Sequence, residues 1–297
     1  MIEKLQEAFK DLRYTDKQHK YFTLQGKELQ SVTKFLSSLK PEFDSDYWTT
    51  LKAYEFSGYK VKSIWNSKFV FRLQDDEGND IRTVNIVDDH SHLSVSPEDV
   101  KAQWKLDALI GNTRGTYIHK YLEDLENRRV DVPLTELIPG MSTAEAVNYV
   151  NSLNVARQLC LEYLEFAQKN LIMVAAEYPV YDEKIGLAGT FDRLYFNKNT
   201  NQYEIWDFKT DKKMRKKSTF GKLKLFDLPD CEFEKYSLQT SLYKKMVQDA
   251  TGVVLGTSRV VWFNLKEKKY EIIDCADYVN LINTTISENR WTTYQQY

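Results

Sequence analysis

Three consecutive strand patterns between residues 177 and 209 constrain the fold more than any other part of the sequence. Tight turns separate them, Asp192 falls late in the second, and the third ends in Asp207-Phe208-Lys209. Because side chains alternate between the two faces of a strand, Asp207 and Lys209 are expected on one face and Phe208 on the other. The pattern predicts a sheet that holds an acid and an amine side by side at one strand end.

Two acids grouped with an amine suit phosphodiester hydrolysis. Carboxylate oxygens of Asp192 and Asp207 hold a hard cation such as Mg2+, and the cation polarises a phosphate and activates a water. Lys209 orients that water or offsets developing charge. When the Asp-x-Lys pair is taken alone, an ordinary salt bridge at a strand end is the default interpretation, so the metal-site interpretation depends on the rest of the chain.

Composition narrows the classes of protein without choosing one. The 297 residues include 41 Lys or Arg and 43 Asp or Glu, and the net charge of -2 gives no global sign of nucleic-acid binding. Cys160, Cys231 and Cys275 are far apart, which argues against zinc, an iron-sulfur cluster and a disulfide framework. The chain opens on a charged amphipathic pattern and has no apolar run of membrane-spanning length. An intracellular, cytoplasmic location without membrane contact is the expectation.

Local patterns predict helices and hairpins around the three strands. Ser31 is expected to cap a short helix, and Gly252 to end a longer one. A helix that begins at Ser96-Pro97 is expected to be interrupted at Gly111 and Gly115. The remaining predictions are a helix at 1–13, hairpins at 19–29, within 60–92 and at 258–275, a long helix or helix pair at 142–170, and a final helix at 276–290. No linker stands out, so one elaborated unit is favoured over two.

The strongest local charge follows directly after Lys209. Between Lys209 and Lys224, eight residues are Lys or Arg and one, Asp211, is acidic. Such a run is usually a solvated surface, but its position after a candidate metal site favours contact with phosphate. The residues expected to bind nucleic acid here are Lys212, Lys213, Arg215, Lys216 and Lys217.

Two helix patterns supply further candidates. His119 and Glu123 are four residues apart on one helix face, and Gln239 and Tyr243 have the same spacing on a later helix, with Tyr236 one turn earlier. Taken alone, a histidine of this kind is usually a surface or core residue, and tyrosines on a half-buried helix usually pack against the core. Glu123 is either an acceptor that fixes the imidazole or a solvated glutamate.

Read in order, the candidates resemble the motifs of the PD-(D/E)XK nuclease superfamily. More narrowly, they are similar to its RecB-like exonuclease branch, which includes phage exonucleases and the mitochondrial genome-maintenance exonuclease. The motifs are Gly115-Thr116 with His119, Glu177, Gly189-Thr190 with Asp192, Asp207-Phe208-Lys209, and Gln239 with Tyr243. The resemblance covers roughly residues 100–275, and the opening HKYFTLQGKELQSVTKFL is similar to the start of phage members.

The resemblance implies a fold of the α/β class. Its core is of the restriction-endonuclease-like type, with a central mixed sheet flanked by helices, and it is expected over residues 101–297. An N-terminal elaboration of helices and hairpins, possibly a guide for DNA ends, is expected over residues 1–100. The two parts are expected to form one compact unit.

The resemblance also implies roles for individual residues. The implied ligands of Mg2+ or Mn2+ are His119, Asp192, Asp207 and the backbone carbonyl of Phe208. Lys209 is implied to position the attacking water, whereas the role of Glu177 is open. Gln239 and Tyr243 are implied to support the site and the substrate strand. Arg114, Tyr236 and Tyr243 are expected to join the basic residues in contacting DNA.

The implied activity is that of a metal-dependent DNA exonuclease that prefers single-stranded or frayed ends, without an iron-sulfur cluster. Its expected setting is DNA replication, recombination or repair, in the host cytoplasm if the chain is phage-encoded. A restriction-type or structure-specific endonuclease and a non-catalytic DNA-binding recombination accessory protein are the alternatives. The sequence leaves open the polarity of cleavage, the oligomeric state and any recombination or replication partner.

Overall fold

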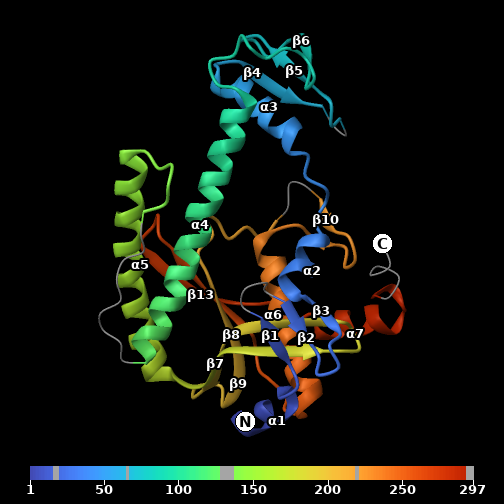
Figure 1. Ribbon diagram of the computed structural model, residues 1–297, viewed down its shortest axis with the longest axis vertical. Coiled ribbons are helices and arrows are strands. Elements are labelled where there is room, and N and C mark those ends of the chain that lie inside the picture. The colour runs from blue at the N-terminus through green and yellow to red at the C-terminus, as the bar shows by residue number, and fades with distance from the viewer. Residues whose placement is uncertain (16–19, 65–66, 128–136, 218–220, 292–297) are drawn as a thin grey trace. The chain divides into compact units, whose positions relative to one another are not determined.

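The computed structural model describes residues 1–15, 20–64, 67–127, 137–217 and 221–291 (Figure 1). The chain divides into two compact units. Unit 1 comprises Met1–Pro41, Arg114–Glu136 and Val147–Tyr297, and unit 2 comprises Glu42–Thr113 and Leu137–Ala146. Helices α4 (Pro97–Glu126) and α5 (Thr143–Asn170) contribute residues to both units. The expected boundary near residue 100 stays a prediction.

A mixed sheet forms the centre of unit 1 (Figure 1). Its eight described strands follow the order β1-β2-β3-β8-β9-β12-β13, and β7 pairs with β8. The β3–β8 and β9–β12 pairs are parallel, and the other pairs are antiparallel. The strands are β1 (Arg13–Thr15), β2 (Lys20–Phe22), β3 (Glu28–Ser31), β7 (Leu171–Asp182), β8 (Leu187–Asn197), β9 (Gln202–Lys209), β12 (Arg259–Asn264) and β13 (Lys269–Asp274). The three strands predicted around residues 177–209 are confirmed as β7, β8 and β9.

Helices cover both faces of this sheet, as the α/β prediction requires. Apolar side chains of α1 (Ile2–Phe9), α2 (Val32–Ser38), α6 (Glu232–Thr251) and α7 (Val279–Ser287) share one core with Ile205 of β9. On the opposite face, Tyr163 of α5 packs edge-on against Phe208, with ring centroids 5.4 Å apart. The alternation predicted for the third strand is therefore confirmed. A two-stranded ladder, β10 (Lys222–Leu223) with β11 (Leu228–Pro229), precedes α6.

Local sequence signals explain most of the helix ends. The Ser31 hydroxyl accepts from the Lys34 N–H at 3.1 Å, which confirms the predicted cap of α2. Gly252 ends α6 with φ 68°, a left-handed conformation that glycine adopts without a Cβ penalty. The predicted interruption of α4 at Gly111 and Gly115 is wrong, because the helix is continuous. A helix-interior glycine costs only about 1 kcal/mol relative to alanine, which the buried face of α4 outweighs.

Unit 2 is a small layer of helix on sheet. Helix α3 (Ser45–Phe56) packs on the antiparallel strands β4 (Lys60–Ser63), β5 (Val70–Gln74) and β6 (Asp80–Asn85). Its core consists of Tyr47, Leu51, Tyr54, Phe71, Leu73 and Val84. The predicted hairpin within residues 60–92 is confirmed as β5 and β6. The sequence did not reveal β4, because the segment Lys-Val-Lys-Ser turns a single apolar side chain inward.

The pairing of β8 changes along its length in a way that positions functional side chains. One side of β8 pairs with β7 along the strand, except at Asp192. On the other side, β3 pairs with Leu187 and Ala188, and β9 pairs with residues 193–197. Residues 189–192, which include Asp192, lie in the interval between these two partners. The backbone edge of this interval has no continuous neighbouring strand, and the Asp192 carboxylate reaches across it to the Phe208 N–H at the end of β9.

A buried carboxylate joins β8, β9 and β12 at the opposite end of this ladder. Glu204 is fully buried and accepts hydrogen bonds from Arg259, Asn197, Thr200 and the Trp206 indole. Burial alone would raise the pKa of the Glu204 carboxyl, but these donors outweigh burial and hold the pKa below its usual range. The ionised carboxylate is therefore part of the folded state.

Replacing Glu204 with Gln is expected to lower the free energy of unfolding by about 2 kcal/mol at pH 7, because Arg259 loses one of its two charged acceptors and keeps Asp274. A carboxyl with a depressed folded-state pKa stabilises the protein above its unfolded pKa and loses this effect as pH falls through the folded value. The difference between wild type and variant should therefore shrink below about pH 4.5. Denaturant unfolding at a series of pH values measures it.

The matched control is Glu271→Gln, which breaks a pair that Lys269 makes at 2.8 Å with both side chains exposed. We expect this change to stay within about 0.5 kcal/mol. Equal destabilisation by the two variants would contradict a special role for the buried carboxylate.

Candidate functional site

One acidic cluster in unit 1 gathers side chains from three elements. His119 comes from α4, Glu177 from β7 and Asp192 from β8, and their ligand atoms all lie within 4.8 Å of one another. The imidazole Nδ1 is 3.5 Å from Asp192 Oδ1 and 3.8 Å from Glu177 Oε1. Two carboxylates and an imidazole at this spacing form a donor set that suits a divalent cation.

The backbone of Phe208 fixes two of these side chains. Its N–H donates to Asp192 Oδ2 at 2.6 Å, and its carbonyl accepts from His119 Nε2 at 3.2 Å. Because a carbonyl oxygen only accepts, Nε2 carries a proton and Nδ1 is the ring nitrogen that faces the acids. The exposed Glu123 is not the acceptor that fixes the imidazole, and the Phe208 carbonyl takes that place.

Asp207 and Lys209 stand beside the cluster as a close ion pair. Lys209 Nζ lies 2.5 Å from Asp207 Oδ2, and the Asp207 residue is almost fully buried. Burial raises the pKa of Asp207 to about 6, Lys209 opposes this shift, and the nearby charge of Asp192 adds to it. The predicted side-by-side arrangement of the two side chains is present, and the strand end carries more negative charge than one lysine neutralises.

The imidazole responds to the same excess of negative charge. Burial would lower the pKa of His119, but Asp192 and Glu177 outweigh burial and raise it to about 9. A proton held between the imidazole and the two carboxylates therefore offsets their charge at neutral pH. A site whose acids recruit a proton in this way fits a metal cation with the same ligands, because the cation supplies that positive charge instead.

Glu177 is held by a buried arginine. Arg193 has no exposed surface, and its guanidinium donates to Glu177 at 3.0 Å and pairs with Glu126 of α4 at 2.8 Å. Glu177 also has φ 45°, a left-handed conformation that is rare for a residue with a side chain. Backbone strain of this kind persists only where surrounding contacts hold it, and it concentrates at functional sites.

Helix α6 packs against β8 at Gly189, next to the site. A Cβ at Gly189 would lie 2.6 Å from Tyr243 Cε1, so only glycine allows the tyrosine ring this close. Gln239 Nε2 donates to the Tyr243 hydroxyl at 3.5 Å. Because Tyr243 is 2% exposed, its ring is not available to stack on a base. From the N-terminal hairpin, the Tyr21 hydroxyl lies 3.1 Å from Thr190 Oγ1.

The basic residues after Lys209 differ in their surroundings. Glu232 binds Arg215 through two contacts, at 2.8 and 2.6 Å, and Lys216 lies over the Phe233 ring, 5.3 Å from its centroid. The side chains of Lys212, Lys213 and Lys217 are exposed, and Arg114 of α4 is half-buried. The five residues that the sequence treats as one patch are thus not equivalent.

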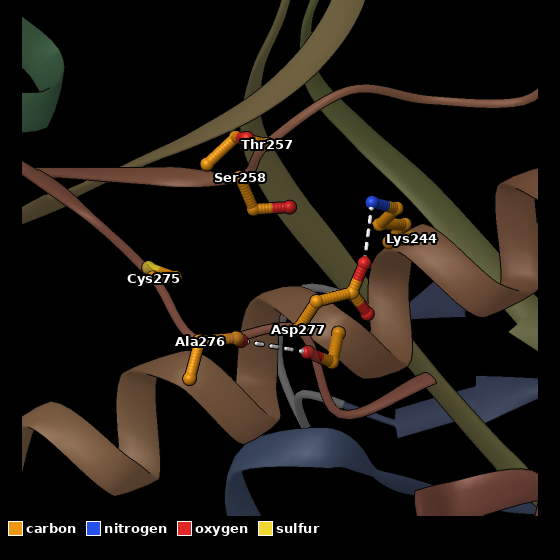
Figure 2. A pocket seen from close by; sticks show the side chains of 7 residues that line it. Lys244, Thr257, Ser258, Cys275, Ala276 and Asp277 are labelled. Carbon is orange, nitrogen blue, oxygen red and sulfur yellow. Dashed lines mark hydrogen bonds and ion pairs between the residues drawn. The ribbon is translucent and has the colours of Figure 1, made fainter. Parts of the chain in front are cut away.

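A separate cavity of about 70 Å³ lies elsewhere in unit 1. Figure 2 shows it with the residues that line it, Ser241, Lys244, Thr257, Ser258, Cys275, Ala276 and Asp277. Lys244 Nζ contacts Asp277 at 2.8 Å and donates to the Gly256 carbonyl at 2.8 Å, so its charge is already compensated. None of the motif residues lines this cavity, which distinguishes it from the acidic cluster.

Comparison with known families agrees with the site geometry. The model of the PD-(D/E)XK nuclease superfamily matches residues 94–296. The chain belongs to the PD-(D/E)XK nuclease superfamily. No curated protein matches the chain. Membership implies a metal-dependent nuclease with DNA as its substrate, and nucleases of this superfamily use divalent metal ions. Among the described residues, no helix is both long enough and apolar enough to span a membrane.

Several residues that organise this superfamily site were not recognised in the sequence. Arg193 directly follows Asp192, and an arginine inside an apolar strand indicates a buried cation that needs acidic partners. Glu126 is seven residues after His119 and lies on the same face of α4. Both residues could have been recognised from the sequence. The contact that Tyr21 makes with Thr190 could not, because it depends on sheet pairing that local sequence does not specify.

Replacing Gly189 with Ala is expected to destabilise the protein by about 1–3 kcal/mol, because the added methyl group would force β8 away from the buried Tyr243 ring. The control is Gly111→Ala, where a Cβ meets nothing within 4 Å. That change should raise stability by up to about 1 kcal/mol, because alanine favours the helix. Calorimetric unfolding of both variants measures the effect, and a stabilising Gly189→Ala would contradict the close packing.

Proposed function

We propose that this chain is an exonuclease of the RecB-like branch that hydrolyses phosphodiester bonds at single-stranded or frayed DNA ends. The observation that carries the proposal is the acidic cluster of His119, Glu177 and Asp192 beside the Asp207–Lys209 pair. The order of these residues along the chain supports the branch, and a role in DNA replication, recombination or repair, in a phage or its host, follows from the same resemblance.

We assign binding of Mg2+ or Mn2+ to the acidic side of this site. Asp192 and Asp207 supply carboxylate oxygens, His119 supplies Nδ1, and Glu177 faces the same point. The Phe208 carbonyl, which accepts from His119, remains a candidate ligand through its second lone pair. A bound divalent ion polarises the phosphate and lowers the pKa of a bound water.

Lys209 is the residue proposed to orient the attacking water. Its ammonium is on the same strand face as Asp207 and keeps its charge, because Asp207 and Asp192 raise its pKa against the opposing effect of burial. An ammonium donates hydrogen bonds and accepts none, so it holds a water through its oxygen. Gln239 and Tyr243 are proposed to support β8 from α6.

The exposed lysines after β9 are proposed to hold the DNA backbone. Lys212, Lys213 and Lys217 are exposed, so phosphate oxygens can reach their ammonium groups. Arg215 is already engaged by Glu232, and it would have to exchange this partner for a phosphate. Lys213 and Lys217 are therefore the stronger candidates for backbone contact.

The decisive experiment incubates the purified chain with 5'- and 3'-labelled single-stranded DNA, duplex DNA and covalently closed circles, with Mg2+ or Mn2+. We expect metal-dependent release of short products from ends and no cleavage of circles. Asp207→Ala and Lys209→Ala should each reduce the rate at least about 10³-fold while leaving DNA binding largely intact, because they remove a ligand and the water-orienting group.

Lys10→Ala serves as the control, since Lys10 pairs with Glu7 on the exposed surface of α1 at 2.6 Å. Its rate should equal that of the wild type. Cleavage of closed circles would point to an endonuclease instead, and full activity of Asp207→Ala would overturn the site assignment.

Replacing both Lys213 and Lys217 with Gln should weaken DNA binding and flatten its salt dependence. Each lost phosphate contact reduces the slope of log K against log salt by about 0.7 on single-stranded DNA. Fluorescence anisotropy over a salt series, in the Asp207→Ala background to prevent cleavage, measures the slope. The matched control is Arg215→Gln, whose guanidinium is bound by Glu232, and it should change the slope less. An unchanged slope in the double variant would leave these lysines as a solvated surface.

A further inference from the structure

Tyr236 lies beside Lys209 rather than on an open surface. The Lys209 ammonium is 4.9 Å from the centroid of the Tyr236 ring. At the far end of the ring, the Tyr236 hydroxyl donates to the carboxylate of Asp211. The ring therefore contacts the lysine with its face while its hydroxyl is bound, and this geometry does not fit a ring that swings out to stack on a base.

Asp211 is fixed in turn by β12. The Trp262 indole N–H donates to the Asp211 carbonyl at 2.8 Å. Trp262 pairs with Lys209 in the parallel register of β9 and β12, so the residue that anchors Asp211 is the direct neighbour of the lysine in the sheet. The contacts close a loop from Lys209 through Asp211 and Tyr236 back to the lysine side chain. We name these three residues, Asp211, Tyr236 and Trp262, the lysine brace.

Lys209 has a second partner, Asp207, for which a bound metal would compete. Asp207 lies 2.5 Å from the ammonium, but the same carboxylate is proposed to bind the metal. A cation draws the carboxylate's charge away from the lysine. The face of the Tyr236 ring does not compete for the cation, because an aromatic ring attracts the ammonium through its quadrupole and offers no hard oxygen ligand.

We propose that Tyr236, held by Asp211, is a positioning residue that keeps the ammonium of Lys209 in place for the reaction. The proposal rests on the nuclease function proposed above. It replaces the expectation that Tyr236 binds a base, and it gives Asp211, the one acid in the basic segment, a defined role. The ring face attracts the ammonium, and small displacements of a reacting group reduce rates strongly.

The test compares steady-state cleavage of a labelled single-stranded oligonucleotide by variants at Tyr236. Tyr236→Leu removes the ring and should lower kcat about 10- to 100-fold with KM unchanged, because the group displaced acts on the reaction rather than on binding. Tyr236→Phe keeps the ring and releases its far end, so it should lower kcat only several-fold. Because kcat is calculated per folded protein, measured by circular dichroism, this partial rescue by phenylalanine reports on the ring rather than on a general loss of stability.

A double-variant comparison addresses Asp211 without removing the ring. Tyr236→Phe and Asp211→Asn each weaken the same hydrogen bond, so kcat of the combined variant should be no lower than that of the poorer single variant. The matched control is Tyr278→Phe. Like Tyr236, Tyr278 donates its hydroxyl to a carboxylate, in this case that of Glu234. This change leaves Lys209 untouched and should leave kcat unchanged.

Each outcome bears on the brace separately from the nuclease function. An inactive wild type contradicts the function itself, whereas an active wild type with unchanged kcat in both Tyr236 variants overturns the brace alone. A rise in KM at constant kcat would also overturn it, in favour of base stacking. If Tyr236→Leu does not fold, as judged by circular dichroism, Tyr236→Phe and the Asp211→Asn combination still decide, because additive losses of kcat would overturn the coupling.

Discussion

The site depends on the cost of holding several carboxylates together in a largely buried place. Buried like charges destabilise a protein unless positive charge or hydrogen bonds compensate them. Here, each acid faces a different partner: Asp192 faces His119, Asp207 faces Lys209, and Glu177 faces Arg193. Arg193 pairs with two acids, Glu126 and Glu177. The carboxylates also raise the pKa values of His119 and Lys209, so the charges of the cluster depend on one another.

The part of the site that lies on β9 could be predicted because strand periodicity alone determines it. Asp207 and Lys209 are two residues apart, and the order of the motifs along the chain supplied the family. Helix ends could be predicted from local signals too, namely the cap at Ser31 and the stop at Gly252. The continuity of α4 could not, because the cost of glycine was outweighed by packing that the local sequence does not contain.

Partners of charged and aromatic residues were the least predictable. Arg215 and Tyr236 were both expected to contact DNA, yet Glu232 binds the first and Asp211 binds the second. Residue type indicates what a side chain is able to bind, whereas the partner that it binds in the folded chain depends on tertiary structure that local sequence does not specify. Arg193 was not expected to have a role, because its two acidic partners lie 67 and 16 residues away, on α4 and β7.

Two hydrogen bonds that order the site use the main chain of Phe208, one through its N–H and one through its carbonyl. Every amino acid except proline presents both groups, so these two hydrogen bonds exclude only proline from this position. The ring packs next to Tyr163, edge-on against the His119 imidazole with centroids 5.7 Å apart, and under the Arg193 guanidinium at 5.2 Å. The middle residue of the Asp-x-Lys sequence therefore serves the site twice: its main chain holds Asp192 and His119 by hydrogen bonds, and its ring supports the imidazole and the arginine that holds Glu177.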